Sequence, residues 1–232
     1  ASFFAVFLFI TLFAVASEAG DRNIPVEVAQ LTDSLKKQFA PDRRVALLDV
    51  DYSFSDKNVM LRGVTTSAEA KNALLKELAR KGYAVMDCLE LLPDVKGLEG
   101  KTCGIINVSV ANMRVAPDFS SEMMTQSLMG MPVRVLQRDG WVRIQTPDNY
   151  IAWVHRVGVH PVTEEEMAAW NKAEKIVVTA HYGFVYSEPN QTSQTVSDVV
   201  AGNRLKWEGS KGAFYKVTYP DGRRGYISKS IA

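Results

Sequence analysis

Histidine, cysteine and long runs of like charge are scarce in this 232-residue chain. It holds three histidines and two cysteines, and its 27 basic residues nearly balance 26 acidic ones. No stretch gathers five like charges, which excludes the basic footprint of a nucleic-acid-binding protein and an acidic tail. The histidines are His155, His160 and His181, and their spacing matches no metal-ligand pattern. The sequence therefore predicts no metal, no cofactor and no nucleic-acid partner.

Neither cysteine lies in a pattern typical of a catalytic nucleophile. Cys88 follows Asp87, but Leu89 and Glu90 come next, and no helix start or histidine lies nearby to activate it. Two alternatives stay open for the pair: a disulfide between Cys88 and Cys103, which an exported protein allows, or two small buried apolar residues. We expect no catalytic residue in this chain.

Only one long apolar run is present, from Phe3 to Ala16. It is shorter than the roughly 20 residues of a membrane-spanning helix, and small residues follow it. Residues 1–19 are therefore predicted to be a signal peptide, which would export the protein to the periplasm or cell envelope. An uncleaved membrane anchor is the alternative. Because no methionine or basic stretch precedes the run, we expect the natural N-terminus to lie upstream of Ala1.

Residues 22–96 have the pattern of a small α+β unit. Apolar residues at helical spacing predict a helix over residues 24–39, ended by Pro41. A second helix is expected to open with a capping box at Thr66 to Glu69 and to end at Gly82. Strands are predicted over residues 44–54, 57–65 and 83–91. With Leu61-Arg62-Gly63 before the second helix, the unit resembles the small BON domains of exported bacterial proteins.

Residues 104–160 and 175–232 carry one pattern twice. "PDNYIAWV" begins at Pro147 and "PDGRRGYI" at Pro220, and in the same register Gly130 aligns with Gly202. Each copy consists of short β segments separated by turn residues. Because a module of about 55 residues buries only about 60% of its unfolded surface, the strands are predicted to curl into a small barrel. The two Pro-Asp phrases are predicted to be hairpin turns.

Between the copies, a second capping box at Thr163 to Glu166 predicts a linker helix within residues 161–174. Trp170 lies on the apolar side of this helix. We expect it to pack between the modules; an acidic ligand contact by the glutamates is the alternative.

The two copies resemble the bacterial SH3-like modules of NlpC-type cell-wall cysteine endopeptidases. The resemblance rests on "NVSVANMRVAPDFSSEMMTQ" and "DNYIAWV" in the first copy, on the whole second copy and on the acidic helix between them. It predicts a mainly β fold: two small SH3-like β-barrels preceded by a small α+β (BON-like) domain, with a linker helix between the barrels. It implies peptidoglycan turnover by cleavage between D-glutamate and the diamino acid of wall stem peptides. The catalytic domain that performs this cleavage follows the second module in that family and is not in this sequence.

The resemblance also implies ligand-binding residues in the first module. In that family an acidic residue and a tyrosine hold the free amino end of the stem peptide, and these match Glu122 and Tyr150. Trp153 is a third candidate. The alternatives are a solvated loop residue for Glu122, a cross-strand packing residue for Tyr150 and a core residue for Trp153. Trp141 is expected to be a core residue.

We therefore expect an exported, monomeric region that recognises peptidoglycan stem peptides and works with a downstream catalytic domain. One alternative is a standalone SH3-repeat protein that binds the wall or another protein without enzymatic activity. Another gives the α+β unit a role at the membrane or in envelope stability. A reading frame that continues past Ala232 into a Cys-Ser-Gly motif would distinguish the endopeptidase from the standalone protein.

Overall fold

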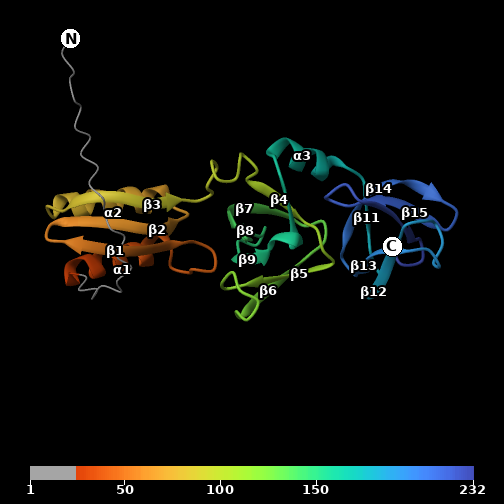
Figure 1. Cartoon of the computed structure of the whole chain (residues 1–232), viewed down its shortest axis with the longest axis horizontal. Coiled ribbons are helices and arrows are strands. Elements are labelled where there is room, and N and C mark those ends of the chain that lie inside the picture. Colours follow the sequence, from red (N-terminus) through yellow and green to blue (C-terminus); the bar gives the residue numbers. More distant parts are fainter. Residues whose placement is uncertain (1–24) are drawn as a thin grey trace, which may run out of the picture.

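A computed structural model describes residues 25–232, so the predicted signal peptide lies outside the described residues. Figure 1 shows three bodies in a row along the long axis: the α+β unit, the first module and the second module. No helix of the described part is long and apolar enough to span a bilayer.

The α+β unit has the predicted order of elements. They are α1 (Val26–Phe39), β1 (Leu48–Ser55), β2 (Asn58–Thr65), α2 (Ala68–Arg80) and β3 (Ala84–Leu91). β1 pairs antiparallel with β2, and β3 pairs parallel with β2 after the crossover through α2. Val28 on α1 and Leu74 and Leu78 on α2 are fully buried in one core with the sheet, as their helical spacing requires.

The capping box predicted at Thr66 is wrong by one residue. Ser67 is the N-cap of α2, and its hydroxyl accepts a hydrogen bond from the Ala70 backbone N–H. The Thr66 hydroxyl is engaged elsewhere, because it accepts a hydrogen bond of 3.0 Å from the backbone N–H of Leu47. The segment that leads into β1 thus shifts the helix start by one position.

The two modules share one strand topology. The first contains β4 (Cys103–Ile106), β5 (Val110–Arg114), β6 (Met123–Leu128), β7 (Pro132–Asp139), β8 (Trp141–Gln145), β9 (Ile151–His155), the 3-10 helix η1 (Arg156–Gly158) and β10 (Val159–Val162). The second contains β11 (Lys175–Val177), β12 (Tyr182–Tyr186), β13 (Thr195–Val200), β14 (Arg204–Lys211), β15 (Phe214–Thr218) and β16 (Arg224–Ser228). The sheet orders β4-β7-β8-β9-β5-β6 and β11-β14-β15-β16-β12-β13 correspond strand for strand, and β10 extends the first sheet. The mainly β fold is confirmed.

The turn residues behave alike in both modules. Gly130 and Gly202 both have positive φ, 83° and 88°, and their backbone N–H groups donate hydrogen bonds of 2.8 Å to the carbonyls of Ile106 and Val178, respectively. In the Pro-Asp turns, Asn149 and Gly222 have φ of 70° and 86°, the left-handed conformation that a tight hairpin needs. The repeat seen in the sequence is therefore a repeat of backbone geometry.

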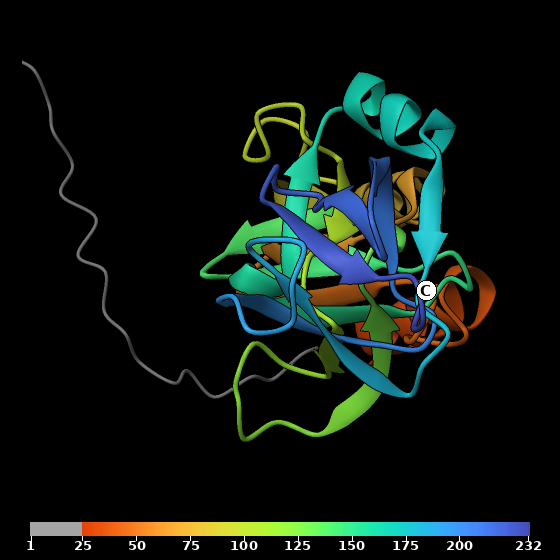
Figure 2. The ribbon, with the colours of Figure 1, turned by 90° about the vertical axis from the view of Figure 1, so that its right-hand side faces the viewer.

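The linker helix α3 (Glu164–Lys172) lies over the junction of the two modules in Figure 1 and at the rim of the molecule in the end-on view of Figure 2. Its capping box between Thr163 and Glu166 is formed as predicted. The indole N–H of Trp170 donates a hydrogen bond of 3.2 Å to the carbonyl of Gly130, and the ring is buried beside Met167. Trp170 therefore fixes the helix to the first module.

Candidate functional site

A small cavity lies between the α+β unit and the first module. Its volume is about 150 Å³, and it is lined by Arg43, Arg44, Leu47, Val115, Met124, Arg143, Ile151, Ala152 and Trp153. The first three residues belong to the segment that joins α1 to β1, and the others lie on or beside β5, β6, β8 and β9. The site therefore exists only because the two bodies dock.

An apolar contact holds this docking. Leu47 and Leu92 of the α+β unit form a buried cluster with Leu136 and Ile151 of the first module. All four side chains are at most 5% exposed. Burial of apolar area on this scale favours association by about 25 cal/mol per Å² removed from water. The docking thus has the character of a small core rather than of a loose surface contact.

Backbone hydrogen bonds set the register of the docking. The N–H of Ile151, two residues after Asn149 of the Pro-Asp-Asn turn, donates to the carbonyl of Arg44 at 2.6 Å. The Gln145 side-chain amide donates to the carbonyl of Val45 at 3.3 Å, and the Asp94 N–H donates to the carbonyl of Leu136. The hairpin that carries the predicted Tyr150 and Trp153 is therefore tied to the preceding unit.

Trp153 lines the cavity, and Tyr150 lies beside it. Both side chains are half-buried. The Arg143 guanidinium carbon is 4.8 Å from the centre of the Trp153 ring, and that of Arg44 is 5.9 Å from the centre of the Tyr150 ring. Each predicted aromatic residue therefore has an arginine over its face, a favourable arrangement of a cation and a π system.

Glu122 is exposed immediately before β6. Its backbone carbonyl accepts a hydrogen bond of 3.1 Å from the N–H of Val115, and Val115 lines the cavity. The three residues predicted from the sequence therefore lie around one part of the first module. Their role in binding remains a prediction.

Arg143 is the most buried of the arginines at the cavity. Burial lowers the pKa of its guanidinium, the Asp49 carboxylate raises it, and the neighbouring charge of Arg43 lowers it again. An arginine stays protonated at physiological pH despite such a shift. Sequence analysis missed this residue; the only signal is its place between buried Val142 and Ile144 on a strand opposite Trp153.

Arg44 differs from Arg143 because it already has an anionic partner. It forms an ion pair of 2.7 Å with Asp42 on the same turn. Hydrogen bonds from Arg44 lower the pKa of the Asp42 carboxyl to about 2. This pair is exposed to solvent, so its net charge contribution to the cavity is small.

A second hollow of about 200 Å³ lies elsewhere on the first module, and it is lined by Phe119, Trp141 and His155 among others. The three rings pack with centroid distances of 4.9 to 5.3 Å. Trp141 was expected to be a core residue, but it is half-buried and lies under the exposed ring of Phe119. The core of the barrel is filled instead by smaller side chains such as Val135 and Ile144.

The disulfide between Cys88 and Cys103 is not formed, and both thiols are free. Cys88 is exposed on β3 and Cys103 is half-buried on β4, strands that belong to different sheets. The alternative of two buried cysteines also fails for Cys88. Burial, with the nearby charge of Glu164, raises the pKa of the Cys103 thiol, which is the opposite of what a nucleophile needs. Within residues 25–232, no three histidine, cysteine or acidic side chains gather as a metal site would require.

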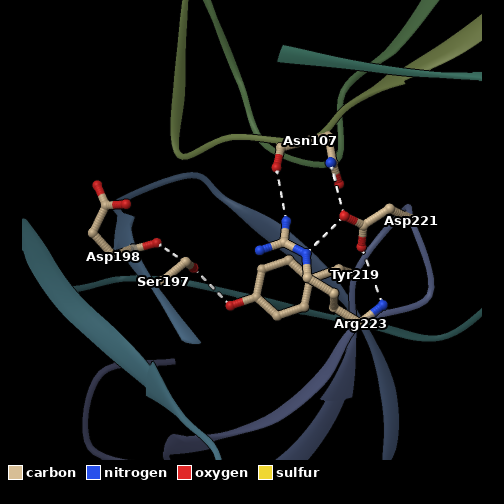
Figure 3. Close-up of polar contacts among 6 residues, drawn as sticks. All are labelled: Asn107, Ser197, Asp198, Tyr219, Asp221 and Arg223. Carbon is tan, nitrogen blue, oxygen red and sulfur yellow. Dashed lines mark hydrogen bonds and ion pairs between the residues drawn. The ribbon is translucent and has the colours of Figure 1, made fainter. Parts of the chain in front are cut away.

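A polar network joins the second module to the first (Figure 3). The Asn107 side-chain amide donates to the Asp221 carboxylate at 3.0 Å, and the Arg223 guanidinium donates to the same carboxylate at 2.7 Å. The Ser109 hydroxyl donates to the Asp198 carboxylate at 2.6 Å. The Pro-Asp-Gly turn therefore docks onto the preceding module, whereas at the Pro-Asp-Asn turn the flanking residues Gln145 and Ile151 make the contact.

Tyr219 supports this network from within the second barrel. Its ring lies 4.6 Å from the Arg223 guanidinium carbon, and its hydroxyl shares a hydrogen bond of 2.7 Å with Ser197. Burial raises the pKa of Tyr219 to about 12, so the hydroxyl stays protonated. A rigid residue of the core thus orients the guanidinium that reaches the first module.

Comparison with known proteins identifies both barrels. Residues 113–157 match the family model of the bacterial dipeptidyl-peptidase SH3 domain, and residues 181–231 match that of the bacterial SH3 domain. No curated protein matches the chain.

Several solved structures are similar over slightly more than half of the chain. An NlpC/P60 family protein from Bacillus cereus ATCC 10987 is 20% identical with a TM-score of 0.46, and the match covers 56% of this chain and 55% of that one. An NlpC/P60 endopeptidase from Photobacterium damselae subsp. piscicida is 15% identical with a TM-score of 0.43, covering 60% and 34%. NlpC2 from Trichomonas vaginalis is 16% identical with a TM-score of 0.24, covering 56% and 46%.

The chain thus spans about half the length of the Bacillus structure and about a third of the Photobacterium one. The activity of a whole protein of this kind therefore belongs to the proposals below. The matched family models and the shared strand order agree on one conclusion: the chain contains two bacterial SH3 domains in tandem.

Proposed function

We propose that this chain is the recognition and targeting region of an exported cell-wall peptidase, and that it binds peptidoglycan stem peptides at its first SH3 domain. The observation that carries the proposal is the gathering of Glu122, Tyr150 and Trp153 around one part of that domain, beside a cavity. In this proposal Glu122 receives the free amino group of the peptide in a charge-assisted hydrogen bond. The aromatic residues form a wall with an apolar face and a polar tip.

The α+β unit has a part in the proposal as well. It supplies Arg43, Arg44 and Leu47 to the cavity, so the first domain does not form the site alone. A BON-like role at the envelope is compatible with this arrangement, because the docking uses only one end of the unit. Cleavage of the peptide would require a catalytic domain outside this sequence.

Binding of the dipeptide L-Ala-γ-D-Glu to the purified chain tests the proposal. Glu122→Ala is expected to weaken binding about tenfold, which corresponds to about 1.4 kcal/mol for one lost charge-assisted hydrogen bond. Isothermal titration calorimetry or nuclear magnetic resonance titration measures the change.

Glu188→Ala is the matched control, since Glu188 is an exposed acidic residue in the corresponding loop of the second domain. It should leave binding unchanged. Equal affinity of wild type, Glu122→Ala and Glu188→Ala would remove Glu122 from the binding site.

A further inference from the structure

We propose that Arg143, with Arg43, binds a carboxylate group on a short aliphatic chain in the cavity between the α+β unit and the first SH3 domain. The inference deepens the proposed function, because it adds an acidic group to the part of the ligand that Glu122 does not contact. It depends on that function only for the identity of the natural ligand; the carboxylate site itself follows from the cavity.

The Arg143 side chain is held in place, and Asp49 is the acidic residue that acts on its charge, but the two form no ion pair. Its guanidinium stacks over Trp153 at 4.8 Å, and its strand neighbours Val142 and Ile144 are buried, which fixes the backbone beneath it. Among residues 25–232, its guanidinium makes no hydrogen bond or ion pair with another side chain. A half-buried guanidinium with free donors is costly unless an anion or water satisfies it.

The charges around the cavity favour an anion. Arg43 is close enough to Arg143 to disfavour its charge, and Arg44 is a third arginine in the lining. Asp42 is engaged by Arg44, and Asp49 is close enough to act on Arg143 without forming an ion pair with it. The lining therefore has more positive than negative charge, and a bound carboxylate would relieve the repulsion between the arginines.

The shape of the cavity selects the kind of anion. A guanidinium is a planar fork that matches the two oxygens of a carboxylate. The remaining lining is mostly apolar, with Leu47, Val115, Met124 and Ile151. A volume of about 150 Å³ has room for a carboxylate and a few neighbouring carbon atoms, but not for a sugar ring with its substituents. A glutamyl side chain has this composition.

The cavity lies close to Glu122. Val115 lines the cavity and its backbone pairs with Glu122, so the acidic residue and the arginines lie on neighbouring parts of one surface. A short peptide with an amino group at one end and a carboxylate further along would meet both charges. The structure thus assigns opposite ends of the ligand to opposite charges of the protein.

Glutarate is the probe for the carboxylate site, and glutaramide is its uncharged isostere. In the purified ¹⁵N-labelled chain, the side-chain Nε–Hε signal of Arg143 should shift in a saturable way with glutarate. Glutaramide should bind at least tenfold more weakly. Arg143→Gln should abolish the saturable response, and Arg43→Gln should weaken it about threefold; because Arg43 is exposed, the second variant keeps the proposal testable if the first fails to fold.

Arg138→Gln is the control, since Arg138 is an exposed arginine of the same domain outside this cavity, and it should bind glutarate as wild type does. Equal binding of glutarate and glutaramide, or an unchanged response in Arg43→Gln and Arg143→Gln, would overturn the carboxylate site. Inorganic phosphate that binds as tightly as glutarate would overturn its selectivity for carboxylate.

L-Ala-γ-D-Glu and its diamide analogue, in which both free carboxylates of the glutamyl residue are amides, separate this inference from the proposed function. Preference for the acid that disappears in Arg143→Gln supports both. Equal binding of acid and amide, with loss of both in Glu122→Ala, rejects the carboxylate site and leaves the proposed function standing. Binding of glutarate without binding of either dipeptide leaves the carboxylate site standing and rejects the proposed function.

Discussion

The two SH3 domains use the same hairpin turn to dock onto the body that precedes each of them, but with different chemistry. In the first domain Leu136 of β7 and Ile151, which lies just after the Pro-Asp-Asn turn, join an apolar cluster with Leu47 and Leu92. In the second domain the Pro-Asp-Gly turn itself provides Asp221, and Arg223 follows it, in a hydrogen-bonded network with Asn107. One backbone element therefore serves two kinds of interface.

A bulge residue in β7 and its counterpart in β14 show how the residue type differs between the two domains. Both barrels have a β-bulge at the same position, which places Leu136 in β7 and Glu208 in β14 outside the regular pairing. Leu136 is 1% exposed because the α+β unit covers it, whereas Glu208 is exposed and forms an ion pair of 2.9 Å with Lys206. The type of residue at the bulge therefore depends on whether a neighbouring body covers it. The barrel fold, which is the same in both domains, does not decide it.

Exchange of the bulge residues Leu136 and Glu208 should reveal the largest difference in the free energy of unfolding between the two domains. Leu136→Glu is expected to lower the free energy of unfolding of the first domain by about 4 kcal/mol, because it removes a buried apolar side chain and buries an unpaired charge. Urea unfolding followed by tryptophan fluorescence measures the change.

The reverse exchange, Glu208→Leu, is the control. It loses only a surface ion pair and should change the free energy of unfolding by less than about 1 kcal/mol. A similar loss of stability in both variants would mean that the two bulge positions do not differ in the way described.

Alanine substitutions at the equivalent Gly130 and Gly202 should differ less in their cost to the free energy of unfolding. A Cβ added at Gly130 would lie 2.3 Å from the backbone oxygen of Arg204, whereas one at Gly202 would meet the flexible end of Leu128 at 2.9 Å. Gly130→Ala is therefore expected to cost about 3 kcal/mol, from left-handed backbone strain and displacement of the second domain. Gly202→Ala should cost about half as much, mainly from the strain. Urea unfolding of both variants tests this order, which equal losses would contradict.

Substitution of Asp221 at the polar junction should change the free energy of unfolding least, and the change should depend on pH. Burial alone would raise the pKa of Asp221, but hydrogen bonds from Asn107 and Arg223 outweigh it and hold the pKa below its usual range. A carboxyl whose pKa is lowered by folding stabilises the folded state above the unfolded pKa, and this stabilisation is lost as the pH falls through the folded pKa.

Asp221→Asn should therefore lose about 1 kcal/mol at pH 7 and have a weaker dependence of stability on pH below about pH 4 than wild type. Unfolding in urea at pH 7 and pH 3 measures both quantities. Asp148→Asn is the matched control, since Asp148 occupies the corresponding place in the first turn and is exposed. Parallel pH profiles for wild type and Asp221→Asn would exclude Asp221 as the titrating group.

Much of the fold could be predicted because its signals are local. Helical spacing identified the buried faces of α1 and α2, and the common register of Gly130 with Gly202 identified two barrels of one kind. The start of α2 at Ser67 was missed because Thr66 bonds to Leu47, which lies 19 residues away in the chain. The place of Trp141 under Phe119 was missed for the same reason, since the spacing of a strand does not say which ring covers another.

By itself, the sequence determined the order of the elements, the repeat and the hairpin turns, because backbone conformation and apolar periodicity depend on near neighbours. The three candidate residues in the first domain came from the family resemblance. Only the tertiary structure decided what surrounds those candidates. Arg43 comes from the α+β unit and Arg143 from the first barrel, and they meet beside Trp153 only after the two bodies dock. The charge of the cavity is therefore a property of the interface, and neither segment contains it alone.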